Sequence, residues 1–571
     1  MLNIRMLLWG ALAAFLYLNY DAWMRDYGTP APAPATTVSA PGADASAPTR
    51  PAPTLGDTVP SAASPAAATT ASAPALGAVG GTAVETAGAD ATQDLTVRTD
   101  VLAVHINLKG GELDQADLLQ YPLRKDAPDV PVRLLNRDNA NSLYVLQTGL
   151  GGDGTQVAPT HLVTWSAPRQ DFALAPGADE VRVPLTWSDG AGLSVTKTFV
   201  FKRGSYAISL VYDARNAGAG PRNLALYAQI LRHWEPAKRS YFDVETYSFK
   251  GPAIYDGTRS RDLKVEDAED ARFAATVTSG WLASMQHHFV AAIVPPAGQP
   301  VKYQLTVQNN QYLLNATGPT VAIPAGGASQ WSENLFVGPK LQSQLAATGP
   351  KLERTADYGK LTVIAQPLFA TLNWVHGLIG NWGWSIIIVT ALIKLVFYPL
   401  SQASGRSMAK MRAVAPRMKQ IQDTFKDDRA KLGQAMMELY KKEKINPLAG
   451  CLPMIVQIPF FISFYWVLLE SVEMRQAPFM LWVNDLSAKD PFFVLPLLMG
   501  AAMFGQFKLN PAPPDPMQAK VMQFMPVIMT AMMAWFPSGL VLYWLTNTVL
   551  SIAQQLRINQ VVEAEARKPR S

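Results

Sequence analysis

A single cation, Lys394, interrupts an apolar stretch that reads WSIIIVTALIKLVFYP over residues 384–399. The stretch is long enough to enter a bilayer, and a lysine at the centre of a spanning helix costs about 2.5 to 3.5 kcal/mol. Two explanations of Lys394 are open. Its ammonium group can extend to a lipid headgroup near Pro399, or it can face a hydrated cavity inside a helical bundle and meet polar groups of a partner.

Further polar residues lie within the apolar segments of the second half of the chain. One such residue carries little information, because polar side chains also join neighbouring helices at a gain of about 0.6 kcal/mol. Together with Lys394, however, the set favours a hydrated interior. Its members are Thr390, Gln457, Ser463, Gln506, Gln523, Thr530, Thr546, Asn547 and Ser551.

Four methionines recur at helical spacing in one of these segments: Met522, Met525, Met529 and Met532. The spacing i, i+3, i+7, i+10 places them on one helix face. Ordinary packing explains such a stripe. A surface that accepts many different apolar segments explains it as well, because the flexible thioether side chain adapts to unlike shapes.

Signatures of catalysis are missing. The chain has no GxxxxGK[ST] or HExxH motif, and no histidine follows His376 that could serve Ser538 in an intramembrane protease. His287 and His288 lie in a predicted strand, where neighbours point to opposite faces, so we expect no metal site there. The run before Cys451 resembles a lipobox but lies in mid-chain. We therefore expect no enzymatic activity and no cofactor.

Composition indicates a membrane protein with a large soluble part. Of 571 residues, 49% are hydrophobic and 16% charged, the formal net charge is +5, and the mean hydropathy is +0.06. One cysteine excludes an internal disulfide framework. Any domain outside the cytoplasm must therefore be stabilised by its apolar core.

The first part of the chain divides into three segments. Residues 1–24 hold a basic start and an apolar run without a small-residue cleavage site, which predicts an uncleaved membrane anchor. Residues 25–94 are rich in Ala and Pro and predict a disordered tether. Residues 95–345 alternate apolar and polar positions, as in 102–108 and 206–212, and predict a large β-sandwich with a hairpin turn at Gly204.

The second part predicts helices in and along a membrane. Residues 355–380 predict a helix that lies on the membrane surface, and residues 381–400 the span that carries Lys394. Further spans are expected at residues 451–470, 491–508, 521–537 and 539–557. With the anchor this makes about six spans. A basic cytoplasmic tail is expected at 558–571.

Residues 401–446 form a basic insert, with eleven Lys and Arg against five Asp and Glu, which predicts a cytoplasmic location. Apolar residues at helical spacing predict a helical hairpin whose apolar faces pack together. The basic outer side chains are either merely solvated or bind an anionic partner such as ribosomal RNA or lipid headgroups. The candidates are Lys410, Arg412, Arg417 and Lys419.

Several long motifs resemble the YidC, Oxa and Alb family of membrane protein insertases. They are LYKKEKINPLAGCLPMIVQIPF (residues 439–460), DLSAKDPFFVLPLLMG (485–500), DPMQAKVMQFMPVIM (515–529) and WFPSGLVLYW (535–544). The large domain before them resembles, more loosely, the periplasmic domain of the Gram-negative members.

This resemblance implies an α-helical membrane protein with a five-helix insertase core, a periplasmic β-supersandwich and a cytoplasmic hairpin. It also implies a hydrophilic groove that is open to cytoplasm and lipid and closed toward the periplasm. The implied partners are nascent membrane proteins, the Sec translocon, the ribosome and membrane lipids, with no small-molecule substrate. The implied location is the bacterial inner membrane, with both termini cytoplasmic.

The resemblance also indicates groove residues. Lys394 stands where the family usually has an arginine, and this is a departure, because lysine lacks the planar fork and permanent charge of arginine. The other groove positions expected are Thr390, Gln457, Gln523, Thr546, Tyr543 and Trp544. The methionine face would contact apolar parts of the client.

The function expected is that of an insertase and chaperone, which inserts and helps fold inner-membrane proteins, alone or with the Sec translocon. A solute transporter or channel is the alternative. The basic hairpin and the lack of repeated discontinuous halves argue against it. An enzyme that acts on periplasmic glycans is a weaker alternative, since no pair of carboxylates can be assigned from the sequence.

Overall fold

The computed structural model describes residues 54–61, 94–236, 248–356, 358, 361–425, 428–443, 452–509 and 516–566. Within these ranges the side chains of 408–410, 412–413, 429, 452–455, 516–522 and 562–566 are not described. The predicted anchor (1–24), most of the predicted tether and the last five residues of the tail lie outside the described residues.

One part of the predicted tether is ordered, so the expectation of disorder is wrong there. Residues Leu55–Asp57 form the short 3-10 helix η1. Leu55 is buried with Val145, Leu231 and Leu313 of the β-domain. The Ala- and Pro-rich composition predicts disorder on average and does not indicate that a single leucine, Leu55, packs into an apolar site of the β-domain.

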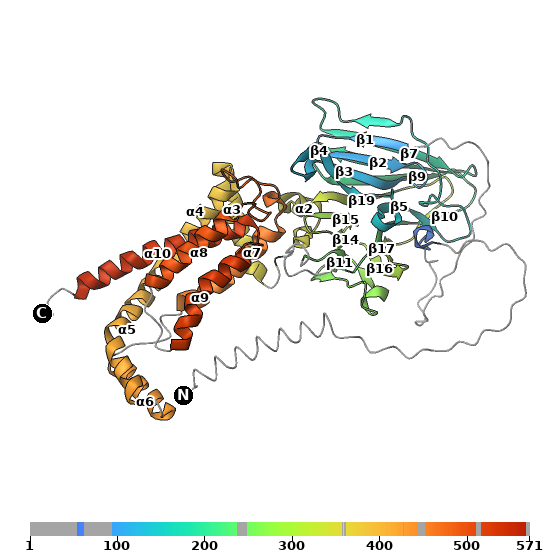
Figure 1. Ribbon diagram of the computed structural model, residues 1–571. Coiled ribbons are helices and arrows are strands. Elements are labelled where there is room, and N and C mark those ends of the chain that lie inside the picture. The colour runs from blue at the N-terminus through green and yellow to red at the C-terminus, as the bar shows by residue number, and fades with distance from the viewer. Residues whose placement is uncertain are drawn as a thin grey trace, which may run out of the picture. The chain divides into compact units, whose positions relative to one another are not determined.

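The β-domain consists of two sheets, drawn in blue to green in Figure 1. In the described residues the first sheet has 11 strands, with the order β13-β16-β17-β10-β5-β3-β2-β1-β6, β18 beside β10 and β4 beside β3. Their bounds are β1 Asp94–Arg98, β2 Leu102–Asn107, β3 Glu112–Arg124, β4 Ala127–Leu135, β5 Tyr144–Gly152, β6 Asp171–Ala173, β10 Arg222–His233, β13 Ala274–Val277, β16 Val301–Gln308, β17 Gln311–Thr317 and β18 Val321–Ile323.

The second sheet has 8 strands in the described residues, in the order β12-β11-β14-β15-β19-β9-β8-β7. Strands β8 and β9 pair antiparallel around Gly204, whose φ is 68°, and this confirms the predicted hairpin. The bounds are β7 Glu180–Ser188, β8 Leu193–Lys202, β9 Ala207–Asn216, β11 Gly251–Tyr255, β12 Ser260–Asp262, β14 Trp281–Met285, β15 Phe289–Val294 and β19 Ala328–Pro339.

The sandwich core follows the predicted alternation. Leu102, Val104 and Ile106 are buried on β2, while the residues between them are half-buried. Two ionisable side chains are exceptions, since Lys197 and Glu333 are 0% and 5% exposed. Burial of an ionisable group in a sheet interior requires a specific explanation.

The second half of the described chain is helical, in yellow to red in Figure 1. The chain breaks by 60° between α4 and α5, around Phe397. The first helix of the predicted hairpin therefore begins at Tyr398, before residue 401. The bounds are α2 Gln342–Thr348, α3 Thr362–Ile379, α4 Trp382–Val396, α5 Tyr398–Thr424, α6 Arg429–Lys442, α7 Leu452–Glu470, α8 Val494–Leu509, α9 Pro516–Met533 and α10 Ser538–Ala566.

Helices α3, α4, α7, α8 and α10 share one apolar core. The turn before α10 is fixed to the loop that precedes α8. Ser538 Oγ donates to Asp485 O at 2.6 Å, and Gly539 N donates to Leu486 O at 2.9 Å. The hydroxyl of Ser538 therefore has a structural partner.

Helices α5 and α6 have a small core of their own. Val414 and Met418 of α5 are buried against Leu439 of α6, and Met436 and Tyr440 pack around them. This packing confirms the prediction that the apolar faces of the hairpin meet.

By length and apolar composition, no single described helix suffices to cross a membrane. The bent pair Trp382–Val396 and Tyr398–Ser407 meets both criteria together. Shorter apolar helices lie at Val456–Glu470, Val494–Leu509 and Gln523–Met533.

Candidate functional site

The ammonium group of Lys394 lies among α4, α7 and α10 and is held by two side chains. Its Nζ donates to Ser551 Oγ at 2.7 Å and to Gln457 Oε1 at 3.4 Å. A lysine ammonium has three donors, of which these acceptors use two. The contacts favour an inward-facing Lys394 over one that extends toward a lipid headgroup.

Asn547 links the two partners of Lys394 to each other. Gln457 Nε2 donates to the side-chain oxygen of Asn547, and Ser551 Oγ donates to the backbone oxygen of Asn547 at 2.7 Å. Asn547 and Ser551 are one turn apart on α10 and so lie on one face. Lys394, Gln457, Asn547 and Ser551 thus form a closed network, the polar cluster, which joins three helices.

Two of the predicted groove residues lie elsewhere. Thr390 is 2% exposed, and its Oγ1 donates to Ile386 O of its own helix at 2.6 Å. The hydroxyl is therefore satisfied within α4 and is not presented to a cavity. Gln523 is exposed on α9 and has no hydrogen bond to the polar cluster among those of the described residues, so its place in a groove stays a prediction.

The remaining predicted groove residues lie on α10, next to the polar cluster in sequence. Tyr543 is buried and stacks on Phe464 of α7 with ring centroids 4.4 Å apart. Trp544 is half-buried and meets the edge of Phe461 at 4.6 Å, and Thr546 is half-buried. The aromatic pair fixes α10 against α7, which sets the register of Gln457 against Asn547.

The methionine face of α9 is largely uncovered. Met525 and Met532 are exposed, and Met529 packs against the edge of the helical core. The side chain of Met522 lies outside the described residues. Two exposed methionines out of the three described favour an adaptable contact surface over ordinary packing.

The basic outer face of the hairpin is described in part. Arg417 is exposed and forms an ion pair with Glu443 at 2.6 Å, and Lys419 is exposed. The side chains of Lys410 and Arg412 lie outside the described residues. An exposed pair contributes little to folding, so the charge of this face remains available to a partner.

The outer faces of the core helices are apolar. Exposed large apolar residues recur on every helix from α7 to α10 and at the end of α4. A soluble domain rarely exposes so much contiguous apolar surface. Examples are Leu395, Val396, Ile458, Leu497, Leu498, Phe524, Val527, Ile528 and Val549.

His287 and His288 do not lie in a strand, as the sequence indicated. They lie in the turn between β14 and β15, and their rings stack with centroids 3.8 Å apart. His287 Nε2 lies 2.9 Å from Leu469 O of α7. Burial lowers the pKa of His287 to about 3 and lowers that of His288 as well, so both are neutral. The described residues contain no group of three His, Cys, Asp or Glu side chains that could hold a metal.

Asn547 and Ser551 belong to the site but were seen in the sequence only as polar residues within a span. Their spacing of four residues places them on one face of α10 and was the available signal. Their pairing with Lys394 depends on how α4, α7 and α10 pack, which the spacing alone does not determine.

Two family models match the chain. The 60Kd inner membrane protein family matches residues 374–565, and the YidC periplasmic domain family matches residues 94–371. The two matches together include all the strands of the β-domain and the core helices.

Several relatives are similar over nearly their whole length. The membrane protein insertase YidC of Thioalkalivibrio sulfidiphilus is 44% identical over 99% of this chain and 100% of its own. That of Nitrosococcus oceani is 43% identical over 99% of both chains. That of Pseudomonas putida (strain W619) is 47% identical over 85% of this chain and 87% of its own.

A solved structure described as an active YidC insertase with the first transmembrane domain resolved is also similar. It is 18% identical and has a TM-score of 0.35, over 81% of this chain and 92% of that chain.

Proposed function

The chain belongs to the YidC family of membrane protein insertases, and on this premise we propose that it passes the polar parts of its clients along the polar cluster. It is a membrane protein insertase of the inner membrane with a periplasmic β-sandwich. The observation that carries the proposal is the closed network of Lys394, Gln457, Asn547 and Ser551 inside helices with apolar outer faces.

The apolar outer faces support spans at residues 381–400, 451–470, 491–508, 521–537 and 539–557, with a first span at 1–24. Lys394 is twelve residues after the start of α4, which corresponds to about 18 Å of helix. The hydrocarbon layer is about 30 Å thick, so about 12 Å would separate the cluster from the cytoplasmic face. A hydrated groove would have to cover only this distance.

Insertion of a client helix does not require energy from nucleotide hydrolysis. A client helix gains about 0.3 to 0.6 kcal/mol for each central Leu, Ile, Phe or Val that enters lipid, so ten such residues supply several kcal/mol. The opposing cost is transfer of the polar flank, for which one central Asp costs about 2.5 to 3.5 kcal/mol. A polar cluster partway across shortens the dry path and lowers this cost.

The hairpin and the exposed methionines would help to deliver client proteins to the polar cluster. The basic outer face of the hairpin suits the RNA of a ribosome or anionic lipid headgroups, both of which carry phosphate. The methionine face of α9 suits apolar client segments of differing shape. We also infer partnership with the Sec translocon and a topology with both termini in the cytoplasm.

The alternative function, a solute transporter or channel, has no support among the relatives, which are named insertases. We expect no enzymatic reaction. The polar cluster holds no carboxylate among its four members. Ser551 Oγ lies 2.7 Å from Lys394 Nζ, but it accepts from that ammonium group and donates its own proton to the backbone oxygen of Asn547, so Lys394 is not placed as its base.

Reconstitution separates the two functions. The purified full chain in liposomes should insert a short single-span client without other proteins, measured as protection of its translocated tail from protease. The same liposomes should remain tight to glucose and to potassium ions. Solute flux without client insertion would overturn the proposal. Protein-free liposomes give the spontaneous rate. The variant Asn547→Leu, which removes the hydrogen bond from Gln457 to the side chain of Asn547, should insert more slowly.

A further inference from the structure

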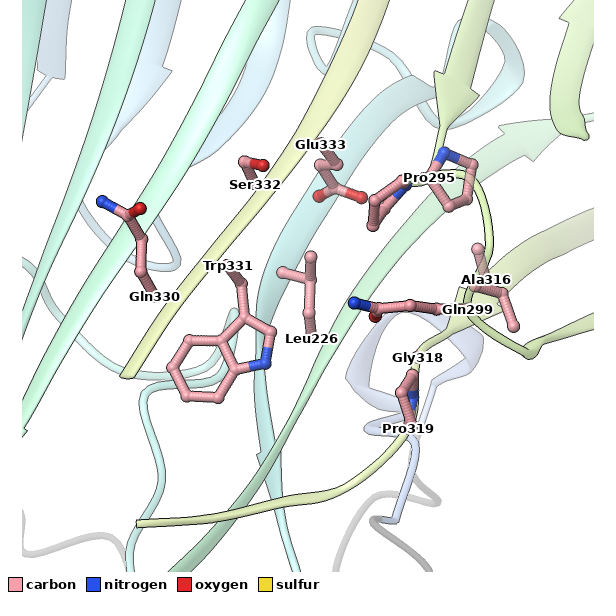
Figure 2. Close-up of a pocket in the computed structure, with 12 residues that line it drawn as sticks. Leu226, Pro295, Gln299, Ala316, Gly318, Pro319, Gln330, Trp331, Ser332 and Glu333 are labelled. Carbon is pink, nitrogen blue, oxygen red and sulfur yellow. The ribbon is translucent and has the colours of Figure 1, made fainter. Parts of the chain in front are cut away.

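A pocket lies between the two sheets of the β-domain, far along the chain from the polar cluster. It has a volume of about 120 Å³. Figure 2 shows Trp331 and Glu333 of β19 on one side and the turn after β15, with Pro295, on the other. Leu226 of β10 and Ala316 of β17 contribute from the first sheet.

The pocket exists because two neighbouring strands differ in length. The pairing of β15 with β19 ends at Val294 opposite Asn334, where the chain turns away through Pro295 and Pro296. Strand β19 continues to Ala328 and pairs with β9 alone over this stretch. Among the described residues, the part of β19 that carries Trp331 and Glu333 thus pairs with no strand on its other side, and the pocket lies there.

Two buried polar groups at this pocket have no hydrogen-bond partner. Glu333 is 5% exposed and its Oε1 is unpartnered, and Trp331 is 9% exposed and its Nε1 is unpartnered. Both side chains project from the same face of β19, since they are two residues apart on one strand. A buried polar group without a partner is costly, so this arrangement requires a ligand or ordered water.

Lys197 is the cation whose charge acts on Glu333 in the described part of the sandwich, and it does not form a pair with it. Lys197 Nζ donates instead to the carbonyl oxygens of Gly111 and Thr148, at 2.5 and 3.3 Å. Burial raises the pKa of Glu333 to about 8, and the Lys197 charge opposes this only in part. Near neutral pH the carboxyl group is therefore mainly protonated and can both donate and accept.

We propose that this pocket binds a small neutral polyhydroxylated molecule, of the polyol or sugar-ring class, through hydroxyl groups that bond to Glu333 and Trp331. A hydroxyl accepts from the indole N–H and also donates to or accepts from the carboxyl group. An ammonium group cannot accept from Trp331. An anion could accept from both groups only while Glu333 is protonated, whereas a hydroxyl group fits either protonation state of the carboxyl group. A hydroxyl therefore satisfies both partners.

The walls of the pocket suit the C–H faces of such a molecule. Pro295, Pro296 and Pro319 present saturated rings, and Trp331 presents an aromatic ring. Gln299 adds one amide at the rim, which can donate and accept. The small volume limits the site to one ring or to the end of a chain. This ligand would be bound by the periplasmic domain and is distinct from the inserted client.

The test uses the full chain in nanodiscs, because maltoside and glucoside detergents carry the proposed chemistry. Saturation-transfer NMR measures the binding of glycerol, D-glucose and maltotriose, with n-butylamine as the cationic comparison. We expect saturable binding of D-glucose. If maltotriose also binds, the natural ligand is the end of a glycan chain. If D-glucose binds and maltotriose does not, the natural ligand is a free sugar.

Two single substitutions connect binding to the pocket. Trp331→Phe removes the N–H and keeps a ring, and Glu333→Met removes the carboxyl group and keeps an unbranched side chain. Each should weaken D-glucose binding by about fivefold or more, as loss of one hydrogen bond predicts. The matched controls Trp187→Phe and Glu180→Met lie on β7, outside the pocket, and should bind as the parent does.

Three results would overturn the proposal. The first is that no hydroxylated probe binds saturably, which would mean that water alone fills the pocket. The second is that D-glucose binds equally to the parent and to both pocket variants. The third is that n-butylamine binds in preference to the hydroxylated probes. Melting temperatures of all variants, compared with the parent, separate loss of the ligand site from loss of the fold.

Discussion

Lys394→Met removes the charge at the polar cluster and keeps an unbranched side chain of similar length. In the parent, Lys394 Nζ lies 2.7 Å from Ser551 Oγ, so the position of the charge is fixed. The bonds from Gln457 and Ser551 to Asn547 do not involve Lys394 and should persist. The folded state should therefore change little, while the attraction for a passing client carboxylate is lost.

The size of this loss follows from Coulomb's law. A carboxylate about 6 Å from the ammonium gains about 3 kcal/mol at an effective dielectric constant of about 20, and about 0.7 kcal/mol in bulk water. These limits correspond to factors of about 100 and about 3 in rate or affinity. Lys394→Met should slow insertion of a client with an acidic translocated tail within this range. A client with a neutral tail should be affected far less.

The assay is protease protection of two clients that differ only in the charge of the tail, inserted into proteoliposomes. Lys394→Arg should keep activity, and Lys394→Glu should discriminate against the acidic tail more strongly than Lys394→Met. Lys302→Glu, an exposed lysine of β16, is the matched control for net charge. Equal effects on both clients, or full activity of Lys394→Glu, would mean that the charge at the cluster takes no part in insertion.

Three further predictions concern other parts of the molecule. Burial lowers the pKa of Lys197 from 10.5 to about 7, so the folded state is penalised below pH 7 and the penalty disappears as pH rises toward 10.5. The stability gained by Lys197→Met should fall by up to about 5 kcal/mol over that interval in denaturant titrations, and a difference that stays constant with pH would refute the lowered pKa of Lys197. Gly500→Ala should lower stability by about 1 to 3 kcal/mol, because its Cβ would clash with Thr530 of α9. Gly505→Ala, which has space, should melt as the parent does, and equal melting of both variants would contradict this contact. Joint replacement by Gln of four hairpin cations, Lys410, Arg412, Arg417 and Lys419, should slow delivery of ribosome-bound clients and leave the melting temperature nearly unchanged. A large fall in the melting temperature would indicate that these cations have a structural role.

The sequence predicts the local structure well where one periodicity dominates. Alternating residues such as Leu102 and Val104 predict strands with one buried face, and Gly204 predicts the turn of a hairpin. The apolar positions of the two hairpin helices, such as Met418 and Leu439, predict their packing. In each case the signal and the structure are set by neighbours within a few residues.

Features that depend on packing between distant segments were not predictable in this way. Lys394 and Gln457 were identified as candidates, but their link through Asn547 needs the register of three helices. Thr390 was expected in a groove and instead bonds to its own helix. His287 and His288 stack because a turn, rather than a strand, contains them, and the turn is set by where β14 ends.

The separate core of α5 and α6 has a mechanical consequence. Gly405 of α5 lies against Ile558 of α10, so this contact can act as a fulcrum. The segment from Gly405 to Thr424 covers nineteen residue steps and forms an arm of about 28 Å, and a tilt of about 10° moves its end by about 5 Å. Helix α10 also carries Asn547 and Ser551. Force applied at the tip of the hairpin is therefore transmitted as torque to the helix that holds half of the polar cluster.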